Sequence, residues 1–286
     1  MLKPGCLFLV ATPIGNLSDI TLRALETLKQ VNLIAAEDTR HSSRLLQHYG
    51  IKTPVTSLHD YNEIKCSQFI CAQLQQGKNV ALISDAGTPL VSDPGYHLVK
   101  TVTASNFPII PIPGACAAIA ALSAAGLPTD KFIFEGFLPA KTNQQLQHLQ
   151  DLITETRTLI FYESPHRLLQ TINNMLTAFG PDRYVVIAKE LTKMFETIYG
   201  NTLIEIQKWL LADPQRQKGE FVILVKGTEK TVTINPEILR ILELLAKELP
   251  SKQAASLTAQ ITGANKNQLY QLLIKKDYQP LRSGSV

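Results

Sequence analysis

The chain has 286 residues, of which 45% are hydrophobic and 18% are charged. This balance excludes intrinsic disorder for most of the chain, and the length predicts two domains with a small addition. The net charge of +4 permits a polyanionic partner without requiring one. The longest apolar run, Ala115–Leu122, is far shorter than the roughly 18–20 residues that cross a bilayer, so we expect no membrane span. The apolar stretch 6–11 is too short for a secretory signal, which predicts a cytoplasmic protein.

Strands and helices alternate along the first 126 residues. The predicted strands are 7–11, 32–36, 80–84 and 108–112, and the predicted helices are 20–31, 39–49, 94–105 and 115–125. Ser18 or Asp19 is the expected N-cap of the first helix, and Gly126 ends the last one. Short strands that are apolar on both faces and alternate with helices are typical of a parallel sheet covered on both sides.

A second alternating series follows the turn at 126–130. Its predicted strands are 132–137, 158–162, 184–188 and 221–225, and its predicted helices are 144–155, 165–179 and 203–211. Three short helices, 236–248, 251–261 and 265–275, complete the chain, with Ser251 and Asn265 as caps and Gly263 as a breaker. We therefore expect an α/β protein with two α/β domains, 1–126 and 127–229, a cleft between them, and a small helical domain, 230–286.

Ligands of open parallel sheets bind beyond the carboxyl ends of the strands, so the loops there are the candidate sites. The loop 12–16 lacks the G-x-G-x-x-G dinucleotide motif, and no phosphate-binding Walker loop is present in the sequence. The loop 84–95, S-D-A-G-T-P-L-V-S-D-P-G, combines glycines that admit a ligand with carboxylates that can bind ribose hydroxyls or a cation. A plain turn is the alternative interpretation of this loop.

Two helix starts are further candidates. At 113–118 a strand turns directly into a helix of tiny residues, which leaves backbone N–H groups open to a ligand or simply allows tight packing. At 37–41 two acidic residues precede Arg40 and His41, and Arg44 follows one turn later. These basic side chains can bind an anion, whereas the acids at a helix N-terminus also fit ordinary capping.

The second half places polar residues at two strand ends, 162–167 and 188–193. Glu190 and Lys193 can converge on the cleft, although a solvated ion pair explains the spacing equally well. His166 fits the first turn of a helix. The cysteines Cys6, Cys66, Cys71 and Cys116 form no metal-binding pattern, so we expect reduced thiols and no metal.

Seven segments together resemble the bacterial ribosomal RNA small-subunit methyltransferase I family, within the tetrapyrrole methylase superfamily. They are L-V-A-T-P-I-G-N-L-S-D-I-T-L-R-A (9–24), A-A-E-D-T-R (35–40), the loop 84–95, P-I-P-G-A-C-A (111–117), G-L-P-T-D-K-F-I-F-E-G-F-L-P (126–139), F-Y-E-S-P-H-R (161–167) and A-K-E-L-T-K (188–193). The segments K-E-L-P-S-K-Q-A-A (247–255) and T-G-A-N-K-N-Q-L-Y (262–270) resemble the small helical domain that this family adds.

The resemblance implies two α/β domains of the tetrapyrrole methylase type, S-adenosylmethionine as methyl donor, and a cytidine ribose 2′-hydroxyl in the decoding region of 16S rRNA as acceptor. It also implies a homodimer that acts on 16S rRNA, and the expected substrate is the rRNA within the 30S subunit. The residues expected to contact the donor are Pro13, Ser84, Asp85, Ala86, Gly87, Thr88, Pro113, Gly114, Cys116, Ala117, Tyr162, Ala188 and Phe221. Glu190 and Lys193 are the candidate catalytic residues. The candidate RNA-binding residues are Arg40, His41, Arg44, Lys189, Lys252, Lys266, Lys275 and Lys276.

Two positions depart from the family pattern. Family members more often carry P-G-P-S-A at 113–117, so the hydroxyl contact of the family is not expected at Cys116, whereas backbone contacts remain. They also often carry arginine where this chain has Lys189, which keeps the charge but lacks the bidentate guanidinium. Residues 231–286 carry seven Lys and Arg against four Asp and Glu, which motivates an RNA-binding tail. The alternative functions are a precorrin-type tetrapyrrole methyltransferase and an RNA-binding ribosome assembly factor without catalysis.

Overall fold

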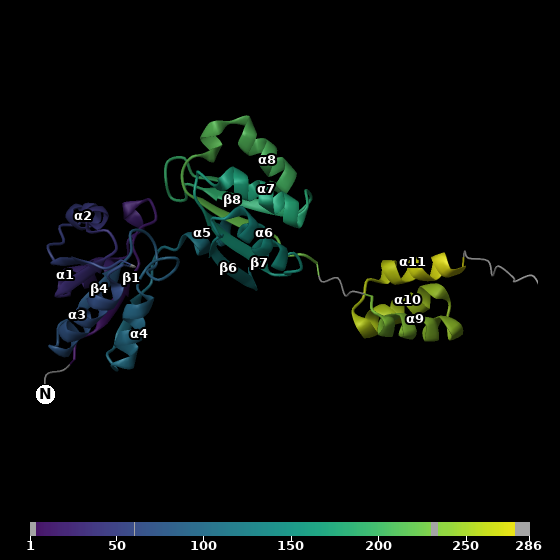
Figure 1. Cartoon of the computed structure of the whole chain (residues 1–286), viewed down its shortest axis with the longest axis horizontal. Helices are drawn as coiled ribbons and strands as arrows, with labels where there is room; N and C mark the ends of the chain where they lie inside the picture. The colour runs from purple at the N-terminus through teal and green to yellow at the C-terminus, as the bar shows by residue number, and fades with distance from the viewer. Residues whose placement is uncertain (1–3, 60, 230–233, 278–286) are drawn as a thin grey trace, which may run out of the picture. The chain divides into compact units, whose positions relative to one another are not determined.

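The computed structural model describes residues 4–59, 61–229 and 234–277, with side chains up to Ile274 (Figure 1). Contacts divide the chain into two compact units, Met1–Gly227 and Thr228–Val286. The first unit contains two five-stranded sheets, and the second consists of helices.

The first sheet is parallel throughout and has the strand order β3-β2-β4-β1-β5. Its strands are β1 (Leu7–Val10), β2 (Leu33–Ala36), β3 (Val55–Ser57), β4 (Val80–Ile83) and β5 (Ile109–Ile112). The helices that follow them are η1 (Leu17–Asp19, 3₁₀), α1 (Leu22–Gln30), α2 (Thr39–His48), α3 (Glu63–Gln75) and α4 (Tyr96–Ala104). Helices α1 and α2 contribute to the apolar cluster on one face, and α3 and α4 contribute to a second cluster on the other. The predicted parallel sheet with two covered faces is therefore confirmed.

The second sheet is mixed, with the order β6-β7-β10-β8-β9. Strands β6 and β7 are parallel, whereas β10 is antiparallel to both of its neighbours, and β8 and β9 are antiparallel. The strands are β6 (Phe132–Phe137), β7 (Thr158–Glu163), β8 (Tyr184–Lys189), β9 (Thr197–Thr202) and β10 (Phe221–Val225). The helices are α5 (Ala117–Ala124), α6 (Thr142–Asp151), α7 (Leu168–Phe179), α8 (Leu203–Ala212) and η2 (Pro214–Gln217, 3₁₀). Every residue of β10 is buried, as expected of a central strand with both faces covered.

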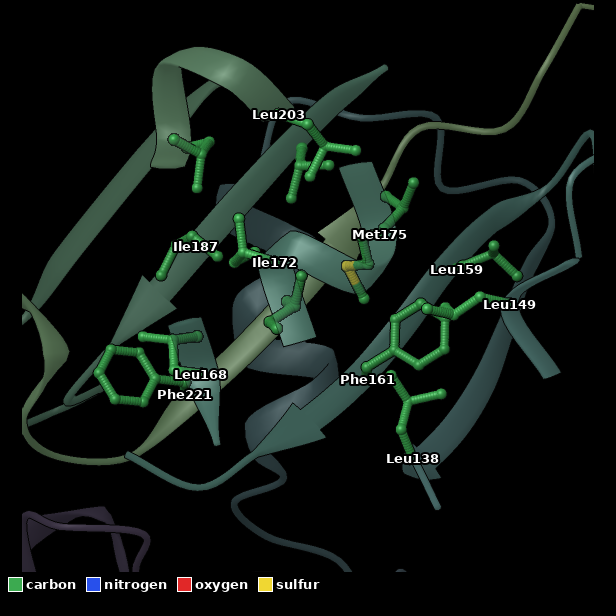
Figure 2. Close-up of a cluster of buried hydrophobic side chains, with 14 of the residues drawn as sticks. Leu138, Leu149, Leu159, Phe161, Leu168, Ile172, Met175, Ile187, Leu203 and Phe221 are labelled. Carbon is green, nitrogen blue, oxygen red and sulfur yellow. The ribbon is translucent and has the colours of Figure 1, made fainter. Parts of the chain in front are cut away.

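Helix α5 follows the last strand of the first sheet but packs on the second sheet (Figure 1). Its Ala118 and Leu122 belong to a cluster with Val186 of β8 and Val222 of β10. Side chains of α6, α7 and α8 fill the opposite face, where Figure 2 shows Ile172 among residues of the strands. The chain segment before α5 therefore links the two sheets, and the boundary expected at Gly126 falls after a helix that contacts the second sheet.

Several local predictions were wrong or incomplete. Strands β3 and β9 and helix α3 were not predicted from the sequence. The N-cap of α1 is Thr21, whose hydroxyl accepts from the backbone nitrogen of Ala24 at 3.1 Å, because Ser18 and Asp19 lie in the 3₁₀ turn before it. Ser251 is the first residue of α10, after Pro250 at the cap position, and makes no capping hydrogen bond.

The second unit contains α9 (Pro236–Glu248), α10 (Ser251–Thr262) and α11 (Lys266–Asp277). The predicted Asn265 cap is confirmed, since its side chain accepts from the backbone nitrogens of Asn267 and Gln268. Gly263 ends α10 in the left-handed region, with φ of 73°. Apolar residues of all three helices form a core of their own, including Leu242, Ala255 and Leu269.

Candidate active site

A cavity with a volume of about 330 Å³ lies in the first unit, at the carboxyl ends of β1, β4 and β5 and beside the second sheet. Its lining residues are Ile14, Ala86, Gly87, Thr88, Val91, Ser92, Asp93, Cys116, Ala117, Phe137, Tyr162, Glu163, Ser164, Pro165, Ala188, Leu191, Glu220, Phe221 and Val222. The volume is within the range of small-molecule sites, and the wall is mostly apolar with a few polar groups, as is usual for a cofactor pocket.

The loop 84–95 forms one wall and is held in a fixed shape. Thr12 and Gly87 exchange backbone hydrogen bonds of 2.8 and 3.0 Å, which attach this loop to the loop after β1. Leu90 and Ser92 have left-handed backbones, with φ of 72° and 67°. Such strain costs about 1–3 kcal/mol per residue and persists where the surroundings enforce it, often at functional sites.

The N-terminus of α5 forms a second part of the wall. The Tyr162 hydroxyl accepts a hydrogen bond from the backbone nitrogen of Ala118 at 3.1 Å, which satisfies one open N–H group of this helix. Burial raises the pKa of the Tyr162 phenol far above its usual value. The phenol is therefore neutral at physiological pH and serves as a fixed polar group between the two halves.

Asp93 places a carboxylate on the cavity wall. Its Oδ2 atom is buried and has no hydrogen-bond partner among the described residues. Burial raises the pKa of Asp93 to about 6, and the charge of Asp85 adds to this effect, while the Ser84 hydroxyl opposes it. Asp93 is thus a stronger base than an ordinary aspartate and is still largely ionised at neutral pH.

Glu190, Lys193 and Glu220 form a charged cluster beside the cavity. The Lys193 Nζ lies 3.0 Å from Glu190 Oε1 and 2.9 Å from Glu220 Oε2, and Glu190 Oε1 also accepts from the backbone nitrogen of Glu220 at 2.9 Å. Burial opposes the charge on Glu190, but the Glu220 N–H and the Lys193 ammonium outweigh it and lower the pKa of Glu190. Burial likewise opposes the charge on Lys193, and its two carboxylate partners raise its pKa. The predicted ion pair is therefore present, with Glu220 as a third member.

The buried Glu163 holds the segment 162–167 in place through hydrogen bonds and an ion pair. Its Oε2 accepts from the Thr171 hydroxyl at 2.6 Å, and its Oε1 accepts from the backbone nitrogen of Ser164 at 2.8 Å. The Arg167 Nε lies 3.5 Å from Glu163, and its Nη2 donates to the backbone oxygen of Leu138 at 2.7 Å. These contacts tie the end of β7 to α7 and to the segment after β6, so this wall is rigid.

The structure brings one group of the predicted donor-binding residues together in the cavity wall: Ala86, Gly87, Thr88, Cys116, Ala117, Tyr162, Ala188 and Phe221. Another group lies outside the lining: Pro13, Ser84, Asp85, Pro113 and Gly114.

Asp85 was expected to face the cleft, but its Oδ1 accepts from the backbone nitrogen of Asp38 at 3.0 Å. Gly114 packs against the residue that follows β1: a Cβ atom added to Gly114 would lie 2.8 Å from the Cβ of Ala11. Glu190 and Lys193 are also outside the lining, although their partner Glu220 belongs to it.

The predicted RNA-binding residues fall into separate places. Arg40, His41 and Arg44 are exposed on α2, where Asp38 caps the helix and lies 3.3 Å from Arg40. The Lys189 Nζ donates to the backbone oxygen of Gln215 at 3.0 Å. Lys252 and Lys266 are exposed in the second unit, and the side chains of Lys275 and Lys276 lie outside the described part of the chain.

Other lining residues were not predicted from the sequence, above all Asp93, Ser92 and Phe137. Asp93 lies within the loop 84–95, but nothing in the sequence distinguishes its environment from that of Asp85. Phe137 ends β6, and its ring centroid lies 5.6 Å from that of Tyr162. Phe137 is the last residue of a predicted strand and is therefore visible in the sequence as a strand end, whereas the position of Asp93 depends on the folded loop.

In the described residues no helix is long and apolar enough to cross a membrane. Residues 4–59, 61–229 and 234–277 contain no cluster of three or more His, Cys, Asp or Glu side chains with the geometry of a metal site. The four cysteines are free thiols, as predicted.

Comparison with known proteins finds two family matches. Residues 6–207 match the tetrapyrrole (corrin/porphyrin) methylases, and residues 232–276 match the RsmI C-terminal HTH domain. Proteins named ribosomal RNA small subunit methyltransferase I are similar over nearly the whole chain. The relative from Haemophilus influenzae is 54% identical over 93% of this chain and 95% of its own, and that from Escherichia coli O157:H7 is 52% identical over 95% and 96%.

Solved structures share the fold at low identity. Cobalt precorrin-4 methyltransferase CbiF superposes with a TM-score of 0.59 at 18% identity, covering 77% of this chain and 94% of its own. Diphthine synthase gives a TM-score of 0.60 at 15% identity, covering 80% and 92%. This similarity supports the arrangement of the two sheets and extends to no particular substrate.

Proposed function

Because the chain belongs to the tetrapyrrole (corrin/porphyrin) methylase family and to its ribosomal RNA small subunit methyltransferase I members, we propose that it methylates the 2′-oxygen of a cytidine ribose in the decoding region of 16S rRNA. The observation that carries the proposal is the similarity to those relatives over more than nine-tenths of the chain. The match of residues 232–276 favours RNA over a small tetrapyrrole as acceptor.

S-adenosylmethionine is the methyl donor of these enzymes, and the cavity suits it. The volume of about 330 Å³ accommodates a nucleoside-sized ligand, and the left-handed Gly87 admits close approach to the backbone. Apolar residues such as Phe221 and Ala188 offer a surface for an adenine ring. When bound, the donor supplies a methyl group on a positively charged sulfur, so the protein mainly has to align the acceptor and accept its proton.

We further propose that the enzyme acts as a homodimer on the 30S subunit and that the second unit contributes RNA contacts. The exposed Lys252 and Lys266 on a small independent core support this role, since phosphate contacts supply most of the affinity for nucleic acid. Arg40 and Arg44 on α2 are candidates for further phosphate contacts within the unit that contains the cavity.

The test is methyl transfer from tritiated S-adenosylmethionine to 30S subunits and to protein-free 16S rRNA, followed by digestion to nucleosides. The proposal requires label on the ribose of a cytidine, at one position in the decoding region. Label on a base would contradict the proposed acceptor atom, and label on neither RNA substrate would favour the assembly factor without catalysis.

A further inference from the structure

Among the described residues, three carboxylates line the cavity: Asp93, Glu163 and Glu220. Both oxygens of Glu163 have partners, Thr171 and Ser164, and its side chain is completely buried. The Glu220 side chain is 75% exposed, and its Oε2 is paired with Lys193. Glu163 therefore has no oxygen without a partner, and Glu220 is largely exposed to solvent and paired with a cation.

Asp93 differs from both of these carboxylates. Its Oδ2 is buried in the wall and unpartnered within the described parts of the chain, which is costly for an oxygen that could otherwise be hydrated. The loop that carries it is held by the Thr12–Gly87 bridge and contains the left-handed Ser92 immediately before Asp93. An enforced backbone and an unsatisfied oxygen at the same place indicate a group kept ready for a ligand.

We propose that Asp93 is the proton acceptor for the acceptor hydroxyl in methyl transfer, an inference that rests on the proposed function. The hydroxyl oxygen forms a bond to the methyl carbon while Asp93 Oδ2 takes the hydroxyl proton. The carbon–sulfur bond breaks, and its electron pair stays on sulfur, which becomes a neutral thioether. The Asp93 carboxyl later releases the proton to water, so charge and atoms balance.

The surroundings of Asp93 suit this role. Burial strengthens Asp93 as a base, and the pKa of about 6 keeps it largely ionised at neutral pH. Ser84 and Asp85 act on the charge of Asp93, which in turn contributes to the raised pKa of Tyr162, and Cys116 and Glu163 line the same cavity. The phenol of Tyr162 stays protonated, so it cannot compete for the hydroxyl proton at this pH.

The experiment compares Asp93→Asn with wild type in single-turnover methyl transfer to 30S subunits, with donor and subunits saturating, across pH 5–9. Removing a general base lowers rates by about 100-fold or more, so we expect that loss together with disappearance of the acid limb of the wild-type pH profile. Calorimetric titration gives the affinity for S-adenosylmethionine, which is expected to stay within about threefold of wild type, since the loss is confined to the transition state. Asp151→Asn on α6, an exposed residue outside the cavity lining, makes the same charge change and is the matched control.

A second variant, Asp93→Glu, retains a carboxyl and is expected to exceed Asp93→Asn in rate and to keep an acid limb. Equal rates for the two variants, a nearly wild-type rate for Asp93→Asn, or an unchanged acid limb would each overturn the proposal. A loss confined to donor affinity would overturn it as well, because Asp93 would then bind the donor and not the proton. An inactive wild type or label on a base would instead contradict the proposed function, so the two failures are distinguishable.

Discussion

The Asp85 Oδ1 atom accepts a hydrogen bond from the backbone nitrogen of Asp38, at 3.0 Å. Asp38 is itself the N-cap of α2 and accepts from the backbone nitrogens of Arg40 and His41. The carboxylate that follows β4 thus fixes the junction between β2 and α2. Two adjacent strands of the first sheet are tied together at the edge where the cavity lies.

We expect Asp85→Ala to lower the free energy of unfolding by about 1.5–3 kcal/mol, because a backbone N–H loses a charged partner. Urea denaturation of the variant and of wild type measures this difference. Unchanged stability combined with weakened binding of S-adenosylmethionine would contradict the structural role and support the donor contact predicted from the sequence.

Asp93→Asn is expected to stabilise the protein without ligand at pH 8. The pKa of Asp93 is raised from 3.8 to about 6 in the folded state, so the unfolded chain loses the proton first and folding stability falls as pH rises from about 4 to 7. A shift of about two units corresponds to nearly 3 kcal/mol before solvent screening, so the expected gain is roughly 1–3 kcal/mol.

The expected gain in stability of Asp93→Asn depends on pH, and this pH dependence serves as the control. At pH 5 wild-type Asp93 is still mostly protonated when folded, so about half of the gain is expected there. Urea denaturation at pH 5 and pH 8 measures both values. A gain that is equal at the two pH values, or a loss at pH 8, would show that the environment of Asp93 does not disfavour its charge.

Glu190→Gln and Lys193→Met are expected to be coupled by about 1 kcal/mol in a double-mutant cycle of stability at pH 7. Because the pKa of Glu190 is lowered in the folded protein, the ion pair stabilises the fold above the ordinary glutamate pKa, and this stabilisation is lost as pH falls through the folded-state pKa of Glu190. Because the pKa of Lys193 is raised, the ion pair persists up to strongly alkaline pH. The methyl-transfer rate of Glu190→Gln is expected to fall less than about tenfold, since general-base losses are larger. A loss as large as that of Asp93→Asn would restore Glu190 as the proton-transferring group predicted from the sequence.

Removal of residues 228–286 is expected to leave donor affinity nearly unchanged, because the cavity lies wholly within the first unit. Affinity for 30S subunits is expected to fall, and the slope of log K against log salt to flatten by about one unit per lost phosphate contact. Filter binding at several salt concentrations measures both quantities. A folded, shortened protein with the same affinity and the same slope would exclude an RNA-binding role for the second unit.

The sequence predicted most of the elements near the cavity because each consists of a short apolar strand and a loop with glycine, proline or aspartate. It did not predict α3, whose Glu63 carboxylate accepts from the backbone nitrogens of His97 and Leu98 at 2.7 and 3.2 Å. This contact joins residues more than thirty positions apart, and no local sequence pattern predicts it. Strand β9 was missed for a similar reason, since T-I-Y-G-N-T is polar and half-exposed and gains its partner only from β8.

The site shows the same limit. Small and aromatic residues at strand ends, such as Ala86, Cys116 and Tyr162, were predicted and line the cavity. The two aspartates of the loop 84–95 could not be distinguished from the sequence, because only the folded loop, with its left-handed Leu90 and Ser92, shows that Asp93 lines the cavity and Asp85 does not. Tertiary structure therefore decides which carboxylate lines the cavity.

The most direct measurement is calorimetric titration of S-adenosylmethionine into wild type, Ala86→Trp and Ala124→Trp. Ala86 lines the cavity, so an indole there fills the space, whereas the exposed Ala124 at the end of α5 lies outside the lining and serves as the control. We expect wild type and Ala124→Trp to bind one donor molecule per chain. We expect Ala86→Trp to bind the donor at least about tenfold more weakly, which corresponds to a loss of at least about 1.4 kcal/mol of binding free energy. Absence of binding to folded wild type, or undiminished binding to folded Ala86→Trp, would contradict the assignment of this cavity as the methyl-donor site.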